Sequence, residues 1–494
     1  MEIHPNWMKD STGMLYAQLY QYFREEIRSR RIPPGTRLPS VRALSRNLHL
    51  SKTTVETAYH QLLAEGYIES RERSGFYVVE WEEEIGEAAG ISRDFPWLEP
   101  IKNSDGQEKV KRQSVEKENT ARVLYDFHHA RVDADHFPYE IWRRYSNQCL
   151  QRENREILYY GDPQGELVLR EQIASYLQKA RGVHAHADAV VIGAGTQLLI
   201  QLLCWLFGRE SQSIAMEEPG YNGVRSVFVQ NGYQVIPIPL DEDGIQVEVL
   251  EASRAPLVYV TPSHQEPLGA VMPYAKRSRL LQWAARTGAY LIEDDYDGEF
   301  RYQTKPIPSL QGMDQAGRVI YLGTFSKSLL PSIRISYMVL PPELLRRYQE
   351  RLREFDQSCS RIHQETLALF MKNGEWERHI RKMRTLYSKK HQAMLSSLHE
   401  QFGERIRVMG HNAGLSMTVE VASLLTAEEL ARVARSAGIR VYPATPKWMA
   451  YPPGQAPVFQ FGFGGLSTEE IAAGIHLLKE TWEPYLPGPK AAYL

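Results

Sequence analysis

Six short apolar runs, each beside a helix-like stretch, constrain the fold of this 494-residue chain more than any other feature. Short apolar runs alternating with helices indicate strands that are buried on both faces of a largely parallel sheet. The runs are residues 190–192, 213–215, 234–236, 257–260, 290–292 and 319–322. We therefore predict an α/β domain over residues 122–494. A smaller C-terminal α+β subdomain should start at about residue 342, where long helices (342–400) precede short strands.

The first 80 residues follow a different pattern. Apolar side chains recur every four residues from Leu15 to Ile27, which marks the buried face of one helix. Ser40 and Ser51 are placed to cap two further helices, and Ser74-Gly75 forms a turn between two short strands. Three helices closed by a hairpin, with a short turn before the last helix, are typical of a winged helix-turn-helix domain.

Residues 81–121 separate these two patterns. They are rich in Glu and Lys and have few periodic apolar positions, which predicts a linker. The predicted domains are therefore residues 1–80, the linker, and residues 122–494. Three scattered cysteines, no leader-like N-terminus and no apolar run of membrane-spanning length favour a cytoplasmic protein outside the membrane. No motif predicts a metal site.

Basic residues are concentrated in the first domain, although the net charge of the chain is only −2. Between Arg24 and Lys52 there are eight basic and two acidic residues. Such a local patch fits a module that contacts phosphates, but a solvated helix face would give the same charge pattern. A helix that starts after Ser51 would also direct its free backbone N–H groups and its dipole at phosphate.

Residues 34–44, 50–55 and 65–67 (PGTRLPSVRAL, LSKTTV and EGY) resemble the GntR family of bacterial repressors, and the resemblance covers about residues 13–79. It implies that the partner is double-stranded operator DNA. The residues implied to contact DNA are Arg42, Lys52, Thr53, Thr54 and the wing tip, Ser74 and Gly75. Lys52 stands where the family usually has arginine. Because lysine lacks a bidentate fork, we expect weaker guanine readout at that position.

Residues 323–334 (GTFSKSLLPSIR) follow a predicted strand and resemble the Schiff-base segment of fold-type I aminotransferases, which use pyridoxal 5'-phosphate (PLP). The resemblance implies that Lys327 binds PLP as an internal aldimine, and that Ser326 and Arg334 hold the phosphate. The run of residues 193–197 (GAGTQ) between a strand and a helix would direct helix N–H groups at the same phosphate. Its contributing residues are Gly195, Thr196 and Gln197.

The acidic run at residues 293–296 (EDDY) lies at the end of another apolar strand. By resemblance, Asp294 keeps the pyridine nitrogen protonated and Tyr296 hydrogen-bonds the phenolate oxygen of the ring, so that Lys327, Asp294 and Tyr296 are the predicted catalytic residues. Asp295 is the alternative to Asp294, because adjacent residues of an extended chain point in opposite directions.

Three further residues have implied roles at the cofactor. Tyr221 is the candidate that stacks on the pyridine ring. Tyr160 matches the tyrosine that reaches the phosphate of the neighbouring subunit, and this role would require a homodimer. His264 is either a residue beside the cofactor or a packed loop histidine, and the sequence does not distinguish the two.

The two resemblances, in this order and joined by a long linker, identify the chain as a member of the MocR/GabR-type regulators. Membership implies a head-to-tail, domain-swapped homodimer and control of transcription by a ligand. The predicted function is to sense an amino compound, or PLP itself, through an aldimine at Lys327. One alternative is an active aminotransferase with an accessory DNA-binding domain. Another is a DNA-binding protein whose cofactor fold is inactive.

Two departures from aminotransferases favour sensing over turnover, although a residual transaminase half-reaction would remain possible chemically. Glu266 occupies a position where these enzymes usually have asparagine, and Gln460 lies where an arginine that binds the substrate carboxylate is expected. The candidates for effector binding are Arg225, Lys447 and Gln460. They leave the effector open among PLP, D-alanine, GABA, taurine and other amines.

Overall fold

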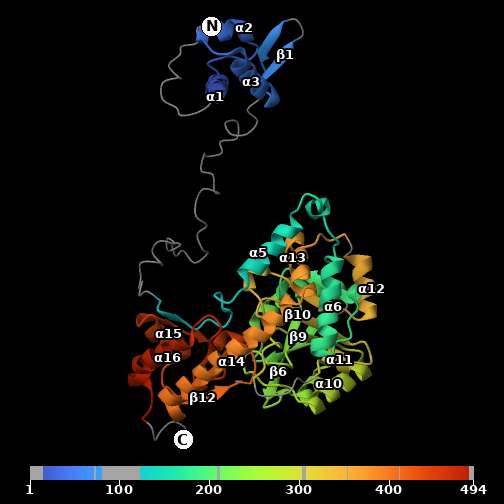
Figure 1. Cartoon of the computed structure of the whole chain (residues 1–494), viewed down its shortest axis with the longest axis vertical. Coiled ribbons are helices and arrows are strands. Elements are labelled where there is room, and N and C mark those ends of the chain that lie inside the picture. The colour runs from blue at the N-terminus through green and yellow to red at the C-terminus, as the bar shows by residue number, and fades with distance from the viewer. Residues whose placement is uncertain are drawn as a thin grey trace. The chain divides into compact units, whose positions relative to one another are not determined.

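The computed structural model describes residues 15–71, 74–80, 123–208, 212–302, 308–352, 354–410 and 412–488. The chain divides into two compact units, Met1–Val115 and Glu116–Leu494 (Figure 1). The linker predicted at residues 81–121 lies outside the described residues. Each unit has its own hydrophobic core and is described here by itself.

The predicted three helices and hairpin of the first unit are confirmed. Both predicted caps are present, because the Oγ atoms of Ser40 and Ser51 accept hydrogen bonds from the backbone N–H groups of Ala43 (3.2 Å) and Thr54 (3.1 Å). The strands pair in antiparallel fashion. The elements are α1 (Leu15–Arg28), α2 (Val41–Leu48), α3 (Lys52–Ala64), β1 (Ile68–Arg71) and β2 (Gly75–Val78).

Aromatic contacts hold the core of the first unit together. Phe23 of α1 and Phe76 of β2 both pack edge-to-face on Tyr59 of α3, at centroid distances of 5.6 and 5.2 Å. The predicted burial of Leu15 is wrong, because this side chain is 48% exposed. It occupies the first position of α1, and the buried face of the helix begins one turn later at Leu19.

The second unit contains an eight-stranded sheet in the order β4-β11-β10-β9-β8-β5-β6-β7. All six predicted runs form strands, and the neighbours from β10 to β6 pair in parallel. The strands are β4 (Val190–Gly193), β5 (Ser213–Glu218), β6 (Gln234–Asp241), β7 (Gly244–Ile245), β8 (Leu257–Val260), β9 (Tyr290–Asp295), β10 (Val319–Thr324) and β11 (Ser336–Val339). The sequence pattern did not predict β7 or β11. β11 runs antiparallel between β4 and β10.

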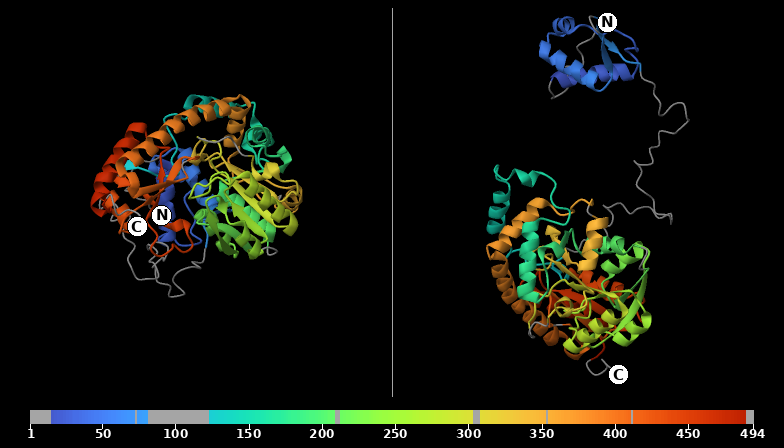
Figure 2. Two further views of the ribbon diagram at one scale, coloured as in Figure 1. Left: turned by 90° about the horizontal axis from the view of Figure 1, so that it is seen from below. Right: turned by 90° about the vertical axis from the view of Figure 1, so that its right-hand side faces the viewer.

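Helices cover both faces of this sheet, and strand β8 shows how. Leu257 and Tyr259 point to one face and pack in the cluster of α7 and α8, whereas Val258 and Val260 point to the opposite face, which α9 and α10 cover. Figure 2 shows helices along the outside of the strands. The helices before β11 are α5 (Tyr139–Cys149), α6 (Leu167–Arg181), α7 (Thr196–Phe207), α8 (Asn222–Gln230), α9 (Val247–Ser253), α10 (Tyr274–Thr287) and α11 (Leu310–Met313).

The C-terminal part forms a four-stranded antiparallel sheet in the order β12-β13-β16-β15. β3 (Tyr125–Asp126), from the start of the unit, pairs in parallel with β14 (Ile439–Arg440) beside this sheet. The remaining elements are α12 (Pro342–Arg351), α13 (Arg361–Lys372), α14 (Glu375–Phe402), β12 (Ile406–Met409), β13 (Ser416–Val421), α15 (Ala427–Ser436), β15 (Tyr442–Pro443), β16 (Val458–Gly462) and α16 (Thr468–Trp482). Among the described residues, no helix combines the length and apolar character that a membrane span requires.

Candidate functional site

A cavity of about 250 Å³ lies where the parallel strands β8, β9 and β10 end. The carboxyl ends of parallel strands meet at one edge of a sheet, and side chains just beyond them converge there. Eight predicted site residues line the cavity: Thr196, Gln197, Tyr221, Asp294, Tyr296, Ser326, Lys327 and Arg334. Residues separated by up to 138 positions in the sequence therefore share one site.

Lys327 lies in the segment that follows β10, and it is the one lysine among the described residues lining the cavity. Its Nζ donates a hydrogen bond to the backbone carbonyl of His129 at 2.6 Å. Burial lowers the pKa of Lys327, although the charge of Glu266 opposes this effect. A lowered pKa increases the fraction of neutral amine, which is the form that attacks a carbonyl.

The two candidate aspartates have different surroundings. Asp294 lines the cavity, where its Oδ2 accepts a hydrogen bond from the Tyr259 hydroxyl at 2.6 Å and its Oδ1 is buried without a partner. Asp295 points away from the cavity, forms an ion pair with Arg181 at 2.5 Å and accepts a hydrogen bond from Tyr321 at 2.7 Å. Of the two carboxylates, only that of Asp294 can contact a group in the cavity.

Burial raises the pKa of Asp294 to about 7, even though the hydrogen bond from Tyr259 lowers it. For Asp295 burial acts in the same direction, but the charge of Arg181 and the hydrogen bonds from Arg181 and Tyr321 together lower the pKa. The carboxylate of Asp295 is therefore ionised and already paired. The carboxyl of Asp294 has no cationic partner among the described residues, so it is available to a cationic group of a ligand in the cavity.

The other end of the cavity combines backbone and hydroxyl groups. Ser326 is ordered by Thr324, whose Oγ1 donates to Ser326 Oγ at 3.0 Å and accepts from the Ser326 backbone N–H at 3.2 Å. Arg334 donates to the carbonyl of Ala194 at 3.2 Å. Gly195 has φ +93°, and a Cβ there would lie 2.0 Å from Nη2 of Arg334. A side chain at this position would displace the guanidinium from the N-terminus of α7, and the positive φ also favours glycine.

His264 does not line the cavity, in agreement with the packed-histidine alternative. Its Nδ1 lies 2.8 Å from Oδ2 of Asp297 and 3.1 Å from the Tyr296 hydroxyl. The Tyr296 hydroxyl also donates to Oε2 of Glu266 at 3.4 Å. His264 therefore acts on the cavity through Tyr296, by holding its hydroxyl in place.

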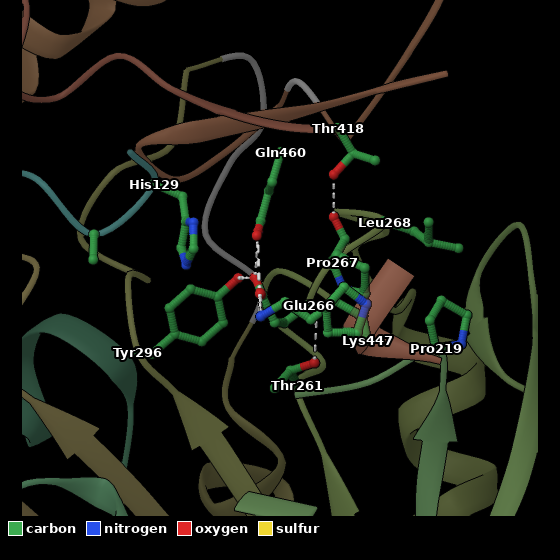
Figure 3. A network of polar contacts seen from close by, with 12 residues as sticks. His129, Pro219, Thr261, Glu266, Pro267, Leu268, Tyr296, Thr418, Lys447 and Gln460 are labelled. Carbon is green, nitrogen blue, oxygen red and sulfur yellow. Dashed lines mark hydrogen bonds and ion pairs between the residues drawn. The ribbon is translucent and has the colours of Figure 1, made fainter. Parts of the chain in front are cut away.

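Glu266 lies at the centre of a polar network beside the cavity (Figure 3). Its Oε1 forms an ion pair with Lys447 at 2.7 Å, and Gln460 donates to Oε1 at 3.1 Å and to Oε2 at 2.9 Å. Burial raises the pKa of Glu266, but the charge and hydrogen bond of Lys447, together with the nearby basic groups of His129 and Lys327, outweigh burial and lower the pKa to about 2. Glu266 therefore presents a negative charge at the cavity wall.

None of the three candidate effector residues lines the cavity. Lys447 and Gln460 both bind Glu266, as described above. Arg225 donates to the backbone carbonyls of Pro446 (2.7 Å) and Lys447 (3.0 Å). The hydrogen-bond donors of Lys447, Gln460 and Arg225 are therefore directed at groups of the protein itself and not at the cavity. Tyr160 also lies outside the cavity of its own chain, with a side chain that is 92% exposed.

Sequence reasoning missed several residues that line the cavity. Most of them lie at or near the end of a strand, but apolar periodicity does not single them out as site residues. They are His129, Ala130, Tyr259, Thr261, Thr324 and Pro331. The doublet His128-His129 was the available signal, because histidine readily exchanges hydrogen bonds and protons with a ligand.

In the first unit, the predicted DNA-contacting residues lie at the start of α3 and on α2. Arg42, Lys52 and Thr53 are exposed. The Thr54 hydroxyl lies 2.8 Å from Ser51 Oγ within the helix cap. At the hairpin, the Ser74 hydroxyl lies 2.6 Å from the Tyr77 hydroxyl, and Gly75 has φ +106°. The helix N-terminus and the exposed side chains of Lys52 and Thr53 thus lie together at one end of α3, an arrangement that suits contact with a phosphate.

Two family profiles match the chain. Residues 15–78 match the bacterial regulatory proteins of the gntR family, and residues 130–455 match the aminotransferases of class I and II. The HTH-type transcriptional regulator YdeL of Bacillus subtilis is 42% identical over 483 residues, which cover 98% of this chain and 100% of YdeL. A probable rhizopine catabolism regulatory protein, MocR of Rhizobium meliloti, is 31% identical and covers 96% and 95% of the two chains.

The second unit is also similar to a solved structure, LysN of Thermus thermophilus, an alpha-aminoadipate aminotransferase complexed with N-(5'-phosphopyridoxyl)-L-leucine. The TM-score is 0.67 and the identity 26%, over 73% of this chain and 92% of LysN. The likeness shows the fold-type I aminotransferase architecture and indicates that this domain binds pyridoxal phosphate.

The residues present fit this cofactor. The buried, unpartnered Oδ1 of Asp294 fits a protonated pyridine nitrogen, and the hydroxyl, guanidinium and helix N-terminus at Ser326, Arg334 and Thr196 fit a phosphate. Lys327 lies at the wall of the same cavity. When bound, the cofactor supplies a carbonyl that condenses reversibly with a primary amine, with loss of water.

Proposed function

The chain belongs to the MocR-type HTH transcriptional regulators, and from this premise we propose that it alters transcription when a small amine reaches the cofactor held at Lys327. The observation that supports this proposal most directly is the cavity itself. It brings together Lys327, Asp294 and Tyr296, the three groups needed for imine chemistry, in a chain that also has a DNA-binding domain. The amine is then the signal and DNA binding is the output.

The proposal is tested by measuring both events in one sample. The holoprotein is titrated with a panel of amines, and the absorbance of the cofactor and the fluorescence anisotropy of labelled DNA flanking its own gene are recorded together. We expect at least one amine to change both signals over the same concentration range. A spectral change without any change in DNA affinity would contradict the sensing role.

The alternative of an active aminotransferase is disfavoured by the charges around the cavity. An amino acid substrate needs a cation for its carboxylate, but Lys447 is paired with Glu266 and Arg225 is bound to backbone carbonyls. Steady formation of keto product from an amino donor and a keto acceptor, at enzyme-like rates, would favour the enzyme over the sensor.

Arg42→Ala is expected to weaken DNA binding by about 10-fold, because it removes a cationic donor from the exposed face of α2. Anisotropy at fixed salt concentration measures this loss, and the spectrum of the cofactor should not change. Arg28→Ala is the matched control, since Arg28 is also exposed but lies at the end of α1. Equal affinities for the Arg42 variant and the wild type would move the recognition surface elsewhere.

We propose further that two chains form a homodimer in which Tyr160 reaches the partner's cavity and the DNA-binding domains are exchanged head-to-tail. The support is an exposed apolar surface on the segment around Tyr160, consisting of Leu150, Leu158, Tyr159 and Tyr160. Large exposed apolar patches on soluble proteins usually mark interfaces.

Leu158→Asp should therefore shift the protein from dimer to monomer, with dimerisation weakened at least about 10-fold. Leu158 is 77% exposed in the isolated chain, so the substitution removes no buried contact within it. Sedimentation velocity over a dilution series measures the shift. Leu424→Asp, at another exposed leucine in the C-terminal part, serves as the control. A dimer that survives Leu158→Asp unchanged would place the interface elsewhere.

A further inference from the structure

His129 is a cavity residue with a fixed side chain. Its ring stacks on that of His128, with centroids 4.9 Å apart and an interplanar angle of 10°. The ring of His128 in turn contacts Tyr442 edge-on, and its Nδ1 accepts from the Ala130 backbone N–H at 3.0 Å. In Figure 3 the imidazole of His129 points toward Tyr296, beside Glu266. Stacking therefore sets the direction of the ring before any ligand arrives.

This imidazole has hydrogen-bonding capacity that the protein does not use. Nδ1 of His129 is buried without a partner. Burial and the charge of Lys327 lower the pKa of His129 to about 3, so the ring is neutral near pH 7. Nδ1 of a neutral imidazole either donates or accepts, depending on the tautomer, so a group that can do both is able to bond it in either tautomer. A hydroxyl has that property, whereas a carboxylate only accepts.

His129 is also close to the reactive amine. Lys327 Nζ donates to the backbone carbonyl of His129 itself, at 2.6 Å. The reacting nitrogen of Lys327 therefore contacts the backbone of the same residue whose side chain lines the cavity. The side chains of His129 and Glu266 line the same cavity as Lys327, so a short amine that reaches Lys327 can place its second functional group beside either of them.

The charges around the cavity act against a carboxylate on the incoming amine. Glu266 presents a negative charge at the wall, and Lys447 and Gln460 already bind its oxygens. Arg334 is the one arginine among the described lining residues, and it lies at the Gly195 end. A carboxylate near His129 would therefore meet an ion pair whose cation is already engaged, and burying a carboxylate without a cationic partner is costly.

We propose that the site selects small amines whose second group is an uncharged hydroxyl, and that His129 is the residue that recognises this hydroxyl. The inference rests on the proposed function and names the class of its effector. The cavity volume of about 250 Å³, which the cofactor must share, limits the effector to a few heavy atoms beyond the amine. Small amino alcohols meet these requirements.

Three amines of matched size test the selectivity: ethanolamine, glycine and ethylenediamine. The holoprotein is titrated with each at constant pH and ionic strength, and the half-saturating concentration is read from the cofactor absorbance. We expect ethanolamine to saturate at a concentration at least 10-fold lower than glycine does. Glycine binding as tightly as ethanolamine would overturn the proposal. Tighter binding of ethylenediamine would also overturn it, because the charge of Glu266 would then dominate selection.

Variants of His129 test the recognising residue. His129→Leu should weaken ethanolamine binding about 10-fold and leave glycine binding unchanged, since only the hydroxyl loses a partner. His129→Gln keeps a donor and an acceptor and should recover part of the affinity. His399→Leu, at an exposed histidine on α14, is the control. Equal losses for ethanolamine and glycine in His129→Leu would mean that His129 has only a structural role.

Glu266→Gln tests the electrostatic part independently of His129. The variant keeps a hydrogen-bonding group near Gln460 but removes the charge that pairs with Lys447. The freed ammonium of Lys447 should then increase the affinity for glycine at least 10-fold. The affinity for ethanolamine should change less. An unchanged ratio of the two affinities would contradict the exclusion of carboxylates by Glu266.

The failure of this inference can be distinguished from the failure of the proposed function. If the wild-type protein retains the cofactor and glycine changes both its spectrum and DNA affinity at concentrations as low as those of ethanolamine, the sensing function holds and only the effector class is wrong. If ethanolamine changes the spectrum but no amine alters DNA binding, the effector class holds and the sensing function is wrong.

Discussion

Lys327→Ala is expected to abolish covalent retention of pyridoxal phosphate and, with it, any response of DNA binding to amines. Lys327 is the one lysine among the described residues that line the cavity, and its Nζ faces the cavity next to the His129 carbonyl. Alanine leaves the phosphate-binding groups in place, so the variant should still bind the cofactor weakly and reversibly. Its affinity for DNA in the absence of amines should remain that of the wild type.

Two measurements check this expectation. Borohydride reduction followed by intact-mass analysis should give a cofactor adduct in the wild type and none in Lys327→Ala. The absorbance of the dialysed variant should lack the band of bound cofactor. Lys179→Ala, at an exposed lysine near the end of α6, is the control and should retain the adduct. An adduct on another lysine of Lys327→Ala would refute the assignment.

Asp294→Asn is expected to weaken cofactor binding about 10- to 100-fold, since it removes a charge-assisted hydrogen bond from a buried site. It should also stabilise the apoprotein at high pH. Burial raises the pKa of Asp294 in the folded state to about 7, compared with about 3.9 in an unfolded chain. Ionising this carboxyl therefore costs more free energy in the folded protein than in the unfolded chain.

The sign of the pH dependence follows from proton binding. Between about pH 4 and pH 7 the unfolded chain has released the proton of Asp294 and the folded protein still holds it. The free energy of unfolding therefore falls as pH rises through this window. Above pH 7 the loss reaches its full value, on the order of 4 kcal/mol for this one group. Asparagine does not titrate, so Asp294→Asn avoids the loss.

Thermal unfolding of the two apoproteins between pH 5 and pH 8 measures this effect. The midpoint of Asp294→Asn relative to the wild type should rise with pH. Burial also raises the pKa values of Glu217 and Glu299 to about 7, but both proteins share these groups and the comparison cancels them. With saturating cofactor the wild type should instead have the higher unfolding midpoint, because cofactor binding stabilises the wild type more than it stabilises Asp294→Asn. A constant difference between the apoproteins across this pH range would contradict the raised pKa.

Much of the candidate site was predictable because its residues lie just after apolar strands. The ends of strands β9 and β10 place Asp294 and Lys327 at one edge of a parallel sheet, and the order of motifs in the sequence is enough to indicate this. The six strands were predictable for the same reason, since their apolar runs alternate with helices. β11 was not, because Ser336 and Tyr337 interrupt its apolar pattern although both are buried.

The amino-acid sequence by itself determined the two kinds of domain, their order, and which lysine and which pair of aspartates carry the chemistry, because these depend on local patterns and motifs. Only the tertiary structure decided which aspartate faces the cavity, since Arg181, 114 residues away, pairs with Asp295. It likewise directed Lys447 and Gln460 to Glu266 rather than to a ligand, and brought His129 to the cavity wall. These outcomes depend on partners distant in the chain, and pairing between distant charges leaves no local signal in a sequence.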